Sequence, residues 1–364
     1  MTDSPARPRP AAPKRRRSLR LGPLTLLWRT RPLLVALCVF AVLVVAFVRA
    51  LLSFDDYPMG SADVVRTLVG GGDSGETFVL FTLRMPRALT AALVGAALGL
   101  AGAIMQSLTR NPLASPDTLG VTWGASVGAI AVIILGGSTG QVSGLVSRLG
   151  VPVGALVGGV LVSMVVFGLA WSSGLESTRL LLVGVAASLF CSNLVYWAMS
   201  WTQVQEASRA QTWLTGSMHA ADWDRVGPAA LALAVLLPLS LAAAHALRAL
   251  TLGDDSARGL GVRVERARLL LLLIATLLAC VAVSAAGPIT FVALAAPQIA
   301  LRLCKLAQPP LVTSALLGSA LTLAADQIAA GLFTVSLPVG VFTAVLGAPY
   351  LMYLIVRRHR EHHL

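Results

Sequence analysis

The amino-acid sequence has few charged side chains and few aromatic ones. Among its 364 residues, Asp, Glu, Lys and Arg make up 12%, whereas a soluble globular domain carries about 25%. Aromatic residues make up 6% and hydrophobic residues 56%. So little charge, with apolar runs along the whole chain, excludes a soluble globular protein. We therefore expect an all-α polytopic membrane protein.

The sequence also lacks motifs that would give it a motor or a metal centre. It has no GxxxxGK(S/T) phosphate-binding loop and no HExxH zinc motif. Its four cysteines form no CxxC pair, so neither a disulfide framework nor a zinc site is predicted. Histidines 359, 362 and 363 lie in the terminal tail, where solvation is the simpler reading. We predict no catalytic residue, no metal site and no cofactor bound by this chain.

The apolar runs are long enough to cross a bilayer repeatedly. About 20 apolar residues are needed to span about 30 Å of hydrocarbon. By that rule we predict ten spans, the eighth being short and flanked by polar residues. They cover residues 32–53, 88–108, 118–137, 150–171, 179–200, 227–247, 268–286, 289–304, 310–333 and 338–356.

The positive charges are unevenly distributed between the predicted loops. Most of the 28 lysines and arginines fall in the N-terminal arm, the C-terminal tail and one set of alternating loops. This bias predicts that both termini lie in the cytoplasm. It also explains the net charge of +12 without nucleic-acid binding. The predicted domains are a disordered basic arm (1–31), a membrane domain (32–357) and a short cytoplasmic tail (358–364).

Small residues and one carboxylate interrupt the apolar spans. Gly95–Gly99, Gly120–Gly124–Gly128 and Gly154–Gly158 recur at four-residue spacing, which favours close helix packing in lipid. Asp326 lies inside the ninth span. Since a carboxylate is costly in lipid, it is either a functional residue or a structural hydrogen-bonding one.

One polar segment, residues 249–262, lies between the sixth and seventh spans. It is too short to be a domain, yet its glycines punctuate short helical pieces, which predicts an ordered knob. On the charge distribution it lies in the cytoplasm. We expect it to be a docking point for a partner outside the membrane.

Three stretches of the sequence resemble one family, the permease subunits of ferric-siderophore, haem and cobalamin ABC importers, the FecCD type. The first is Arg84-Met-Pro-Arg87 with residues 106–120, and the second is residues 252–268. The third is residues 286–300, continued by Ala325-Asp326 and by residues 337–349. Within the family, the Gly-Asp-Asp and Val-Glu-Arg-x-Arg motifs are most similar to those of the ferric-enterobactin permeases.

The resemblance implies a bundle of about ten transmembrane helices like that of the cobalamin permease, and it also implies partners. A second permease subunit, identical or not, would complete the translocation path. Two ATPase subunits carrying ATP and Mg²⁺ would sit on the cytoplasmic face, and an extracytoplasmic siderophore-binding protein would deliver the substrate. The chain itself would be a non-catalytic, multi-pass subunit of the plasma (inner) membrane.

The resemblance also implies roles for individual residues. Arg84 and Arg87 would receive acidic residues of the binding protein, and Ser177 and Thr178 would lie at an inner gate. Ala330 stands where the cobalamin permease has a further arginine, so the docking surface is not copied whole. The residues that match the family's ATPase-coupling helices are Gly253, Asp254, Asp255, Ala257, Arg258, Gly259 and Gly261.

Other functions stay open at the level of the sequence. The same importer class could carry cobalamin or haem instead of a ferric siderophore. A stand-alone secondary carrier or channel is a second class, although such a carrier would show several intramembrane ionisable groups in a relay. An intramembrane enzyme is a third, which the missing acid–base constellation disfavours.

Overall fold

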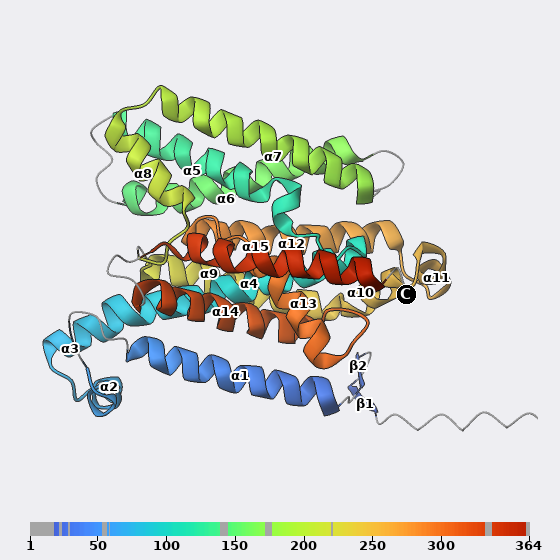
Figure 1. Cartoon of the computed structure of the whole chain (residues 1–364), viewed down its shortest axis with the longest axis horizontal. Helices are drawn as coiled ribbons and strands as arrows, with labels where there is room; N and C mark the ends of the chain where they lie inside the picture. Colours follow the sequence, from blue (N-terminus) through green and yellow to red (C-terminus); the bar gives the residue numbers. More distant parts are fainter. Residues whose placement is uncertain are drawn as a thin grey trace, which may run out of the picture.

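The computed structural model describes residues 18–21, 24–27, 30–52, 57, 59–138, 145–171, 177–219, 221–331 and 337–361. Nearly all of these residues are helical, and the long helices run side by side along one axis (Figure 1). The predicted all-α fold is therefore confirmed.

Each predicted span contains an apolar helix. Within the described residues, seven helices are long and apolar enough to cross a membrane, and three shorter apolar helices occupy the third, eighth and tenth predicted spans. The helices in these ten positions are α1 (Thr30–Leu51), α4 (Met85–Thr109), α5 (Val121–Ser138), α6 (Leu145–Ala170), α7 (Ser177–Ser200), α9 (Trp223–Ala242), α12 (Val264–Ala286), α13 (Val292–Cys304), α14 (Leu311–Gly331) and α15 (Val339–Glu361).

Shorter elements lie at the two ends of the bundle. At one end are α2 (Ser61–Leu68), α3 (Ser74–Phe78), the π-helical η1 (Val79–Arg84) and α8 (Val204–Leu214). At the other end are α10 (Ala244–Thr251) and α11 (Asp254–Gly259), near the start of α1 and the end of α15 (Figure 1). A short 3₁₀ helix, η2 (Pro116–Leu119), connects α4 to α5. The segment around α11 therefore lies at the same end of the bundle as the first and last described helical residues.

Helix α4 is the centre of the bundle. Of its apolar stretch 83% is buried, against 6% for α1 at the edge. It packs against α9, α12, α13 and α14. The packing is close because a methyl group added at Gly95 or Gly99 would collide with the backbone of α14, at Gly318 and Ser314 respectively. The predicted packing role of this glycine pair is confirmed.

A second close pair of helices, α5 and α6, forms with α7 a layer on the opposite side of the bundle from α1 (Figure 1). A methyl group at Gly128 would collide with the carbonyl of Gly154, and one at Gly158 with the carbonyl of Gly124. The predicted packing role of these four glycines is confirmed. Gly120 serves differently, because it ends η2 with a φ of 76°, a left-handed conformation that favours glycine.

Two short strands lie before α1, inside the stretch for which the composition predicts a basic arm. Ser18–Leu21 (β1) and Leu24–Leu27 (β2) pair as an antiparallel hairpin, with Leu21 opposite Leu24. The leucines that alternate in Ser-Leu-Arg-Leu suit a strand as well as a loop. The basic run Lys14–Arg17 and the tail residues 362–364 lie outside the described residues.

Candidate functional site

The polar segment between α9 and α12 folds into two short helices joined by a tight turn. Gly253, with a φ of 112°, separates α10 from α11 in a conformation that other residues avoid. At the far end of α11, Gly261 has a φ of 80° and donates its N–H to the carbonyl of Arg258 at 2.9 Å. The N–H of Val262 reaches back to the carbonyl of Ala257 at 3.0 Å. These two bonds form a Schellman motif, which ends a helix sharply. The predicted ordered knob is present, and two of its glycines, Gly253 and Gly261, have a conformational reason.

The knob has an inner and an outer face. Ala257 is fully buried, and it joins Leu247 and Leu250 in the main apolar core. Leu252 and Leu260 are 67% and 59% exposed. Ala257, predicted as a coupling residue, thus holds α11 against the bundle, whereas the outer leucines are available to a partner.

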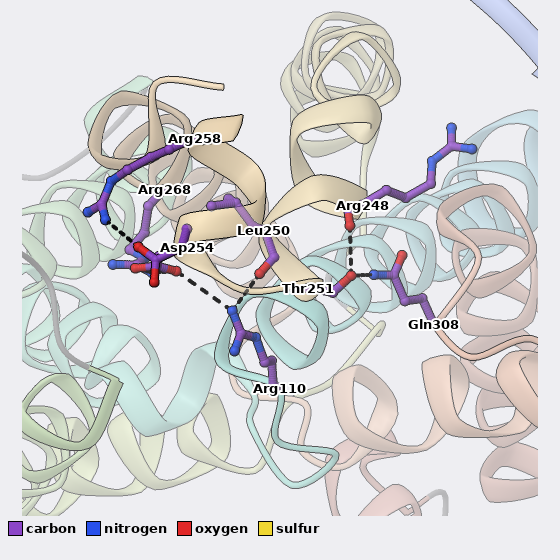
Figure 2. A network of polar contacts seen from close by, with 9 residues as sticks. Arg110, Arg248, Leu250, Thr251, Asp254, Arg258, Arg268 and Gln308 are labelled. Carbon is purple, nitrogen blue, oxygen red and sulfur yellow. Dashed lines mark hydrogen bonds and ion pairs between the residues drawn. The ribbon is translucent and has the colours of Figure 1, made fainter. Parts of the chain in front are cut away.

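The two adjacent aspartates that begin α11 point in different directions. The Asp255 side chain is 100% exposed and pairs with Arg258 one turn later, at 3.1 Å. Both carboxylate oxygens of Asp254 accept from Nη2 of Arg268 on α12, at 2.9 and 3.0 Å. Nη2 of Arg110, at the end of α4, lies 3.6 Å from Oδ1 of Asp254. Figure 2 shows both guanidinium groups turned toward Asp254.

At the opposite end of the bundle, Arg84 is used within the chain. Its residue is only 5% exposed. Its Nη1 donates to the carbonyl of Leu51 at the end of α1, at 3.0 Å, and its Nη2 donates to the carbonyl of Tyr57 at 2.7 Å. The π-helical turn η1 ends at this arginine. Arg84 therefore fastens the end of α1 to the start of α4.

Arg87, one turn later, forms an ion pair across to α14. Its Nε and Nη2 donate to the two oxygens of Asp326, at 2.8 and 3.0 Å. The Asp326 side chain is 7% exposed and that of Arg87 is 23% exposed. A bidentate pair of this kind is among the stronger charge-assisted hydrogen bonds. The intramembrane carboxylate singled out from the sequence thus joins two packed helices.

A buried amide pair was not singled out from the sequence. Gln298 on α13 donates to Oε1 of Gln106 on α4 at 2.7 Å, and Gln106 donates to the carbonyl of Leu294 at 3.1 Å. Both residues are at most 6% exposed. The signal available was a glutamine inside each of two apolar runs, since a buried amide in lipid requires a partner.

The residues predicted at an inner gate lie at the start of α7. Ser177 is the first residue of that helix, and Thr178 is exposed. The neighbouring Arg179 donates to the carbonyl of Leu169 near the end of α6, at 3.2 Å. Glu176 lies outside the described residues. In the part of the chain that the structure describes, no group of three or more His, Cys, Asp or Glu side chains is placed to hold a metal ion.

Fold and site together define a helical membrane protein that crosses the bilayer several times and displays an ordered polar knob between two of its spans. Residues 39–357 match the sequence model of the FecCD transport family. The chain belongs to that family.

Individual relatives are similar over most of their length. The ferric enterobactin transport system permease protein FepG of Escherichia coli (strain K12) is 37% identical over 309 residues, covering 83% of this chain and 89% of FepG. YfhA of Bacillus subtilis (strain 168), described as a probable siderophore transport system permease protein, is 39% identical over 297 residues, covering 81% of this chain and 86% of YfhA. The solved structure of a transporter described as a putative metal-chelate type ABC transporter, in an inward-facing conformation, matches with a TM-score of 0.73 and 26% identity, covering 89% of this chain and 99% of that one.

Proposed function

We propose that this chain is the permease subunit of an ATP-driven importer that carries a ferric siderophore into the cytoplasm. The observation that carries the proposal is family membership over residues 39–357, together with relatives whose descriptions concern ferric enterobactin and siderophores. Its partners would be a second permease subunit, two ATPase subunits and an extracytoplasmic binding protein. ATP and Mg²⁺ would be bound by the ATPases, with no cofactor on this chain.

The knob formed by α10 and α11 would be the contact for an ATPase subunit. Its outer face combines the exposed leucines 252 and 260 with the exposed charges of Asp255 and Arg258. Apolar contacts rimmed by charge suit a stable protein interface. ATP binding would draw the ATPases together and shift the pore between two conformations, because the two conformations bind the closed ATPase pair with different affinity.

Docking of the binding protein would take place at the opposite end, around Arg84 and Arg87. Both arginines already have partners within the chain, Arg84 in two backbone carbonyls and Arg87 in Asp326. An acidic residue of the binding protein would therefore compete with Asp326 for Arg87, which is the more exposed of the two arginines. At the coupling end, Ser177 and Thr178 would line the inner gate. The protein would be a multi-pass plasma (inner) membrane protein with both termini in the cytoplasm.

Uptake of a labelled ferric siderophore tests the proposal. A strain without this chain, and without a redundant system, should lose uptake, and the wild-type gene should restore it. Labelled haem and cobalamin, assayed in the same strains, identify the alternative substrates of the same importer class. Unchanged ferric-siderophore uptake in the deletion strain contradicts the proposed substrate. In proteoliposomes, uptake by the chain without ATPase or ATP would instead support a stand-alone carrier.

A further inference from the structure

Three segments of the chain contact the region around the turn between α10 and α11 (Figure 2). They are the end of α4, the start of α12 and the loop between α13 and α14. From that loop Gln308 donates to the Thr251 hydroxyl, which in turn donates to the carbonyl of Arg248 at 2.8 Å. The knob is therefore attached to the bundle by more than the two chain ends that lead into and out of it.

Arg110, at the end of α4, contacts both short helices of the knob. Its Nη2 donates to the carbonyl of Leu250 at 2.6 Å and lies close to the carboxylate of Asp254. Leu250 is in the last turn of α10, where the helix carries partial negative charge, and Asp254 is the first residue of α11. One guanidinium thus contacts both helices across the turn at Gly253.

Arg268 holds the same carboxylate from the other side. Its side chain is 17% exposed, so its bonds to Asp254 are partly shielded from water. Charge-assisted hydrogen bonds are about twice as strong as neutral ones, so Arg268 holds the Asp254 carboxylate firmly beside the glycine turn. Since Arg110 ends α4 and Arg268 begins the second turn of α12, Asp254 is fixed to two helices that pack on each other.

We propose that Arg110 and Arg268 are positioning residues that clamp Asp254, so that movement of α11 is passed to α4 and α12, whereas Asp255 and Arg258 belong to the outer face that meets the partner. This inference rests on the proposed function. It assigns different roles to two adjacent aspartates: Asp254 transmits movement to the bundle, and Asp255 contacts the partner. The central position of α4 makes it the element through which a small shift at the knob reaches most of the bundle.

Two aspartate variants and one arginine variant test the clamp in the complete transporter, reconstituted in proteoliposomes with its second permease, its ATPases and its binding protein. Asp254→Asn weakens the clamp, and Asp255→Asn is the matched control one residue away. Arg110→Gly removes the guanidinium without straining the backbone, because Arg110 has a φ of 52°, which glycine adopts freely. The measured quantities are ATPase co-purification, ATP hydrolysis and substrate transported per ATP.

With Asp254→Asn and with Arg110→Gly, ATPase co-purification and hydrolysis should persist while substrate transported per ATP falls about tenfold, the effect expected when one charge-assisted contact is lost. Asp255→Asn should keep the transport ratio and weaken co-purification. Exchanging the charges, with Asp254→Arg and Arg268→Asp together, should restore part of the ratio that either single change removes. Equal transport ratios for the Asp254→Asn, Arg110→Gly and wild-type proteins would overturn the clamp.

A second measurement does not depend on the ATPases. In the purified full chain, amide hydrogen exchange over residues 249–262 should speed up several-fold with Asp254→Asn and stay unchanged with Asp255→Asn. The same exchange rate in both variants would overturn the clamp. If the wild-type chain binds no ATPase but shows this difference, the proposed function fails and the clamp stands as a structural contact.

Discussion

At the scale of single residues, Arg87 and Asp326 show how two helices far apart in the sequence are fixed together. They stand 239 positions apart and form a bidentate ion pair between α4 and α14. If either residue of the pair is removed, the charge of the other stays largely buried without a partner, and its desolvation is no longer compensated. The pair therefore sets the relative height of the two helices as well as holding them.

A double-mutant cycle measures this pair. Asp326→Asn should destabilise the detergent-purified chain by about 2–3 kcal/mol, since Arg87 loses a charged partner and keeps its burial. Arg87→Gln should cost a similar amount, and the two changes together should cost less than their sum. Denaturant titration followed by tryptophan fluorescence gives the four values. Strictly additive losses would show that the two side chains do not interact.

The sequence identified Asp326 and both arginines but could not pair them. A carboxylate within an apolar run indicates that the side chain needs a partner. The neighbouring residues do not indicate that this partner lies 239 residues earlier. The same limit applies to Asp254 and Asp255, which are identical neighbours. Only the position of α11 against α4 and α12 decides which carboxylate turns inward. The burial of Arg84 could not be predicted from the sequence either. The two carbonyls that accept from it belong to Leu51 and Tyr57, which lie 33 and 27 residues earlier.

At the scale of elements, glycines decide which helices touch most closely. Gly318 on α14 faces the carbonyl of Gly95, and the backbone of Gly99 lies beside it. Lipid gives no hydrophobic drive for helices to associate, so dispersion between closely approaching backbones holds them instead. The four-residue spacing in the sequence was enough to predict close packing, although it did not identify α14 as the partner of α4.

Adding one methyl group tests this packing. Gly318→Ala should push α4 and α14 apart and destabilise the chain by about 1–3 kcal/mol, because the obstructing atoms are backbone and cannot rotate away. Gly168→Ala in α6 is the matched control, since nothing lies within 4 Å of the added methyl group. Size-exclusion chromatography after heating should give a lower midpoint for Gly318→Ala alone. Similar midpoints for both variants would contradict the packing argument.

At the scale of the whole molecule, the two ends of the bundle differ in chemistry. The end with α11 gathers Arg110, Arg258 and Arg268, whereas the end with α2 and α3 pairs Arg66 with Glu76 and also carries Asp63 and Asp73. Hydropathy sufficed to predict the membrane domain because each span is a continuous apolar run. It could not predict the π-helical turn before α4 or the short helices α2 and α3, which depend on contacts between segments.

Cysteine labelling tests the predicted orientation. After Cys38, the exposed native cysteine, is replaced by Ser, Val69→Cys should react with a membrane-impermeant maleimide in intact spheroplasts. Val69 is 84% exposed at the end opposite the knob, which the charge distribution predicts to lie outside. Leu260→Cys, at a position 59% exposed on the knob, should react only in inside-out vesicles. The reason is the excess of Lys and Arg at the knob end, which favours retention in the cytoplasm. Labelling of the position-260 thiol in intact spheroplasts would reverse the topology.

The central place of α4 also bears on how the chain is made. α4 ends at Thr109, and its principal neighbour α14 begins only at Leu311. At a synthesis rate of roughly 5–20 residues per second, α4 waits in the bilayer for on the order of 10–40 s before α14 emerges. During that interval its glycine face and Arg87 have no native partner on α14. Quality-control proteases and insertion chaperones of the membrane would meet the nascent protein in this half-assembled form, and a chain truncated before α14 should be a preferred substrate for them.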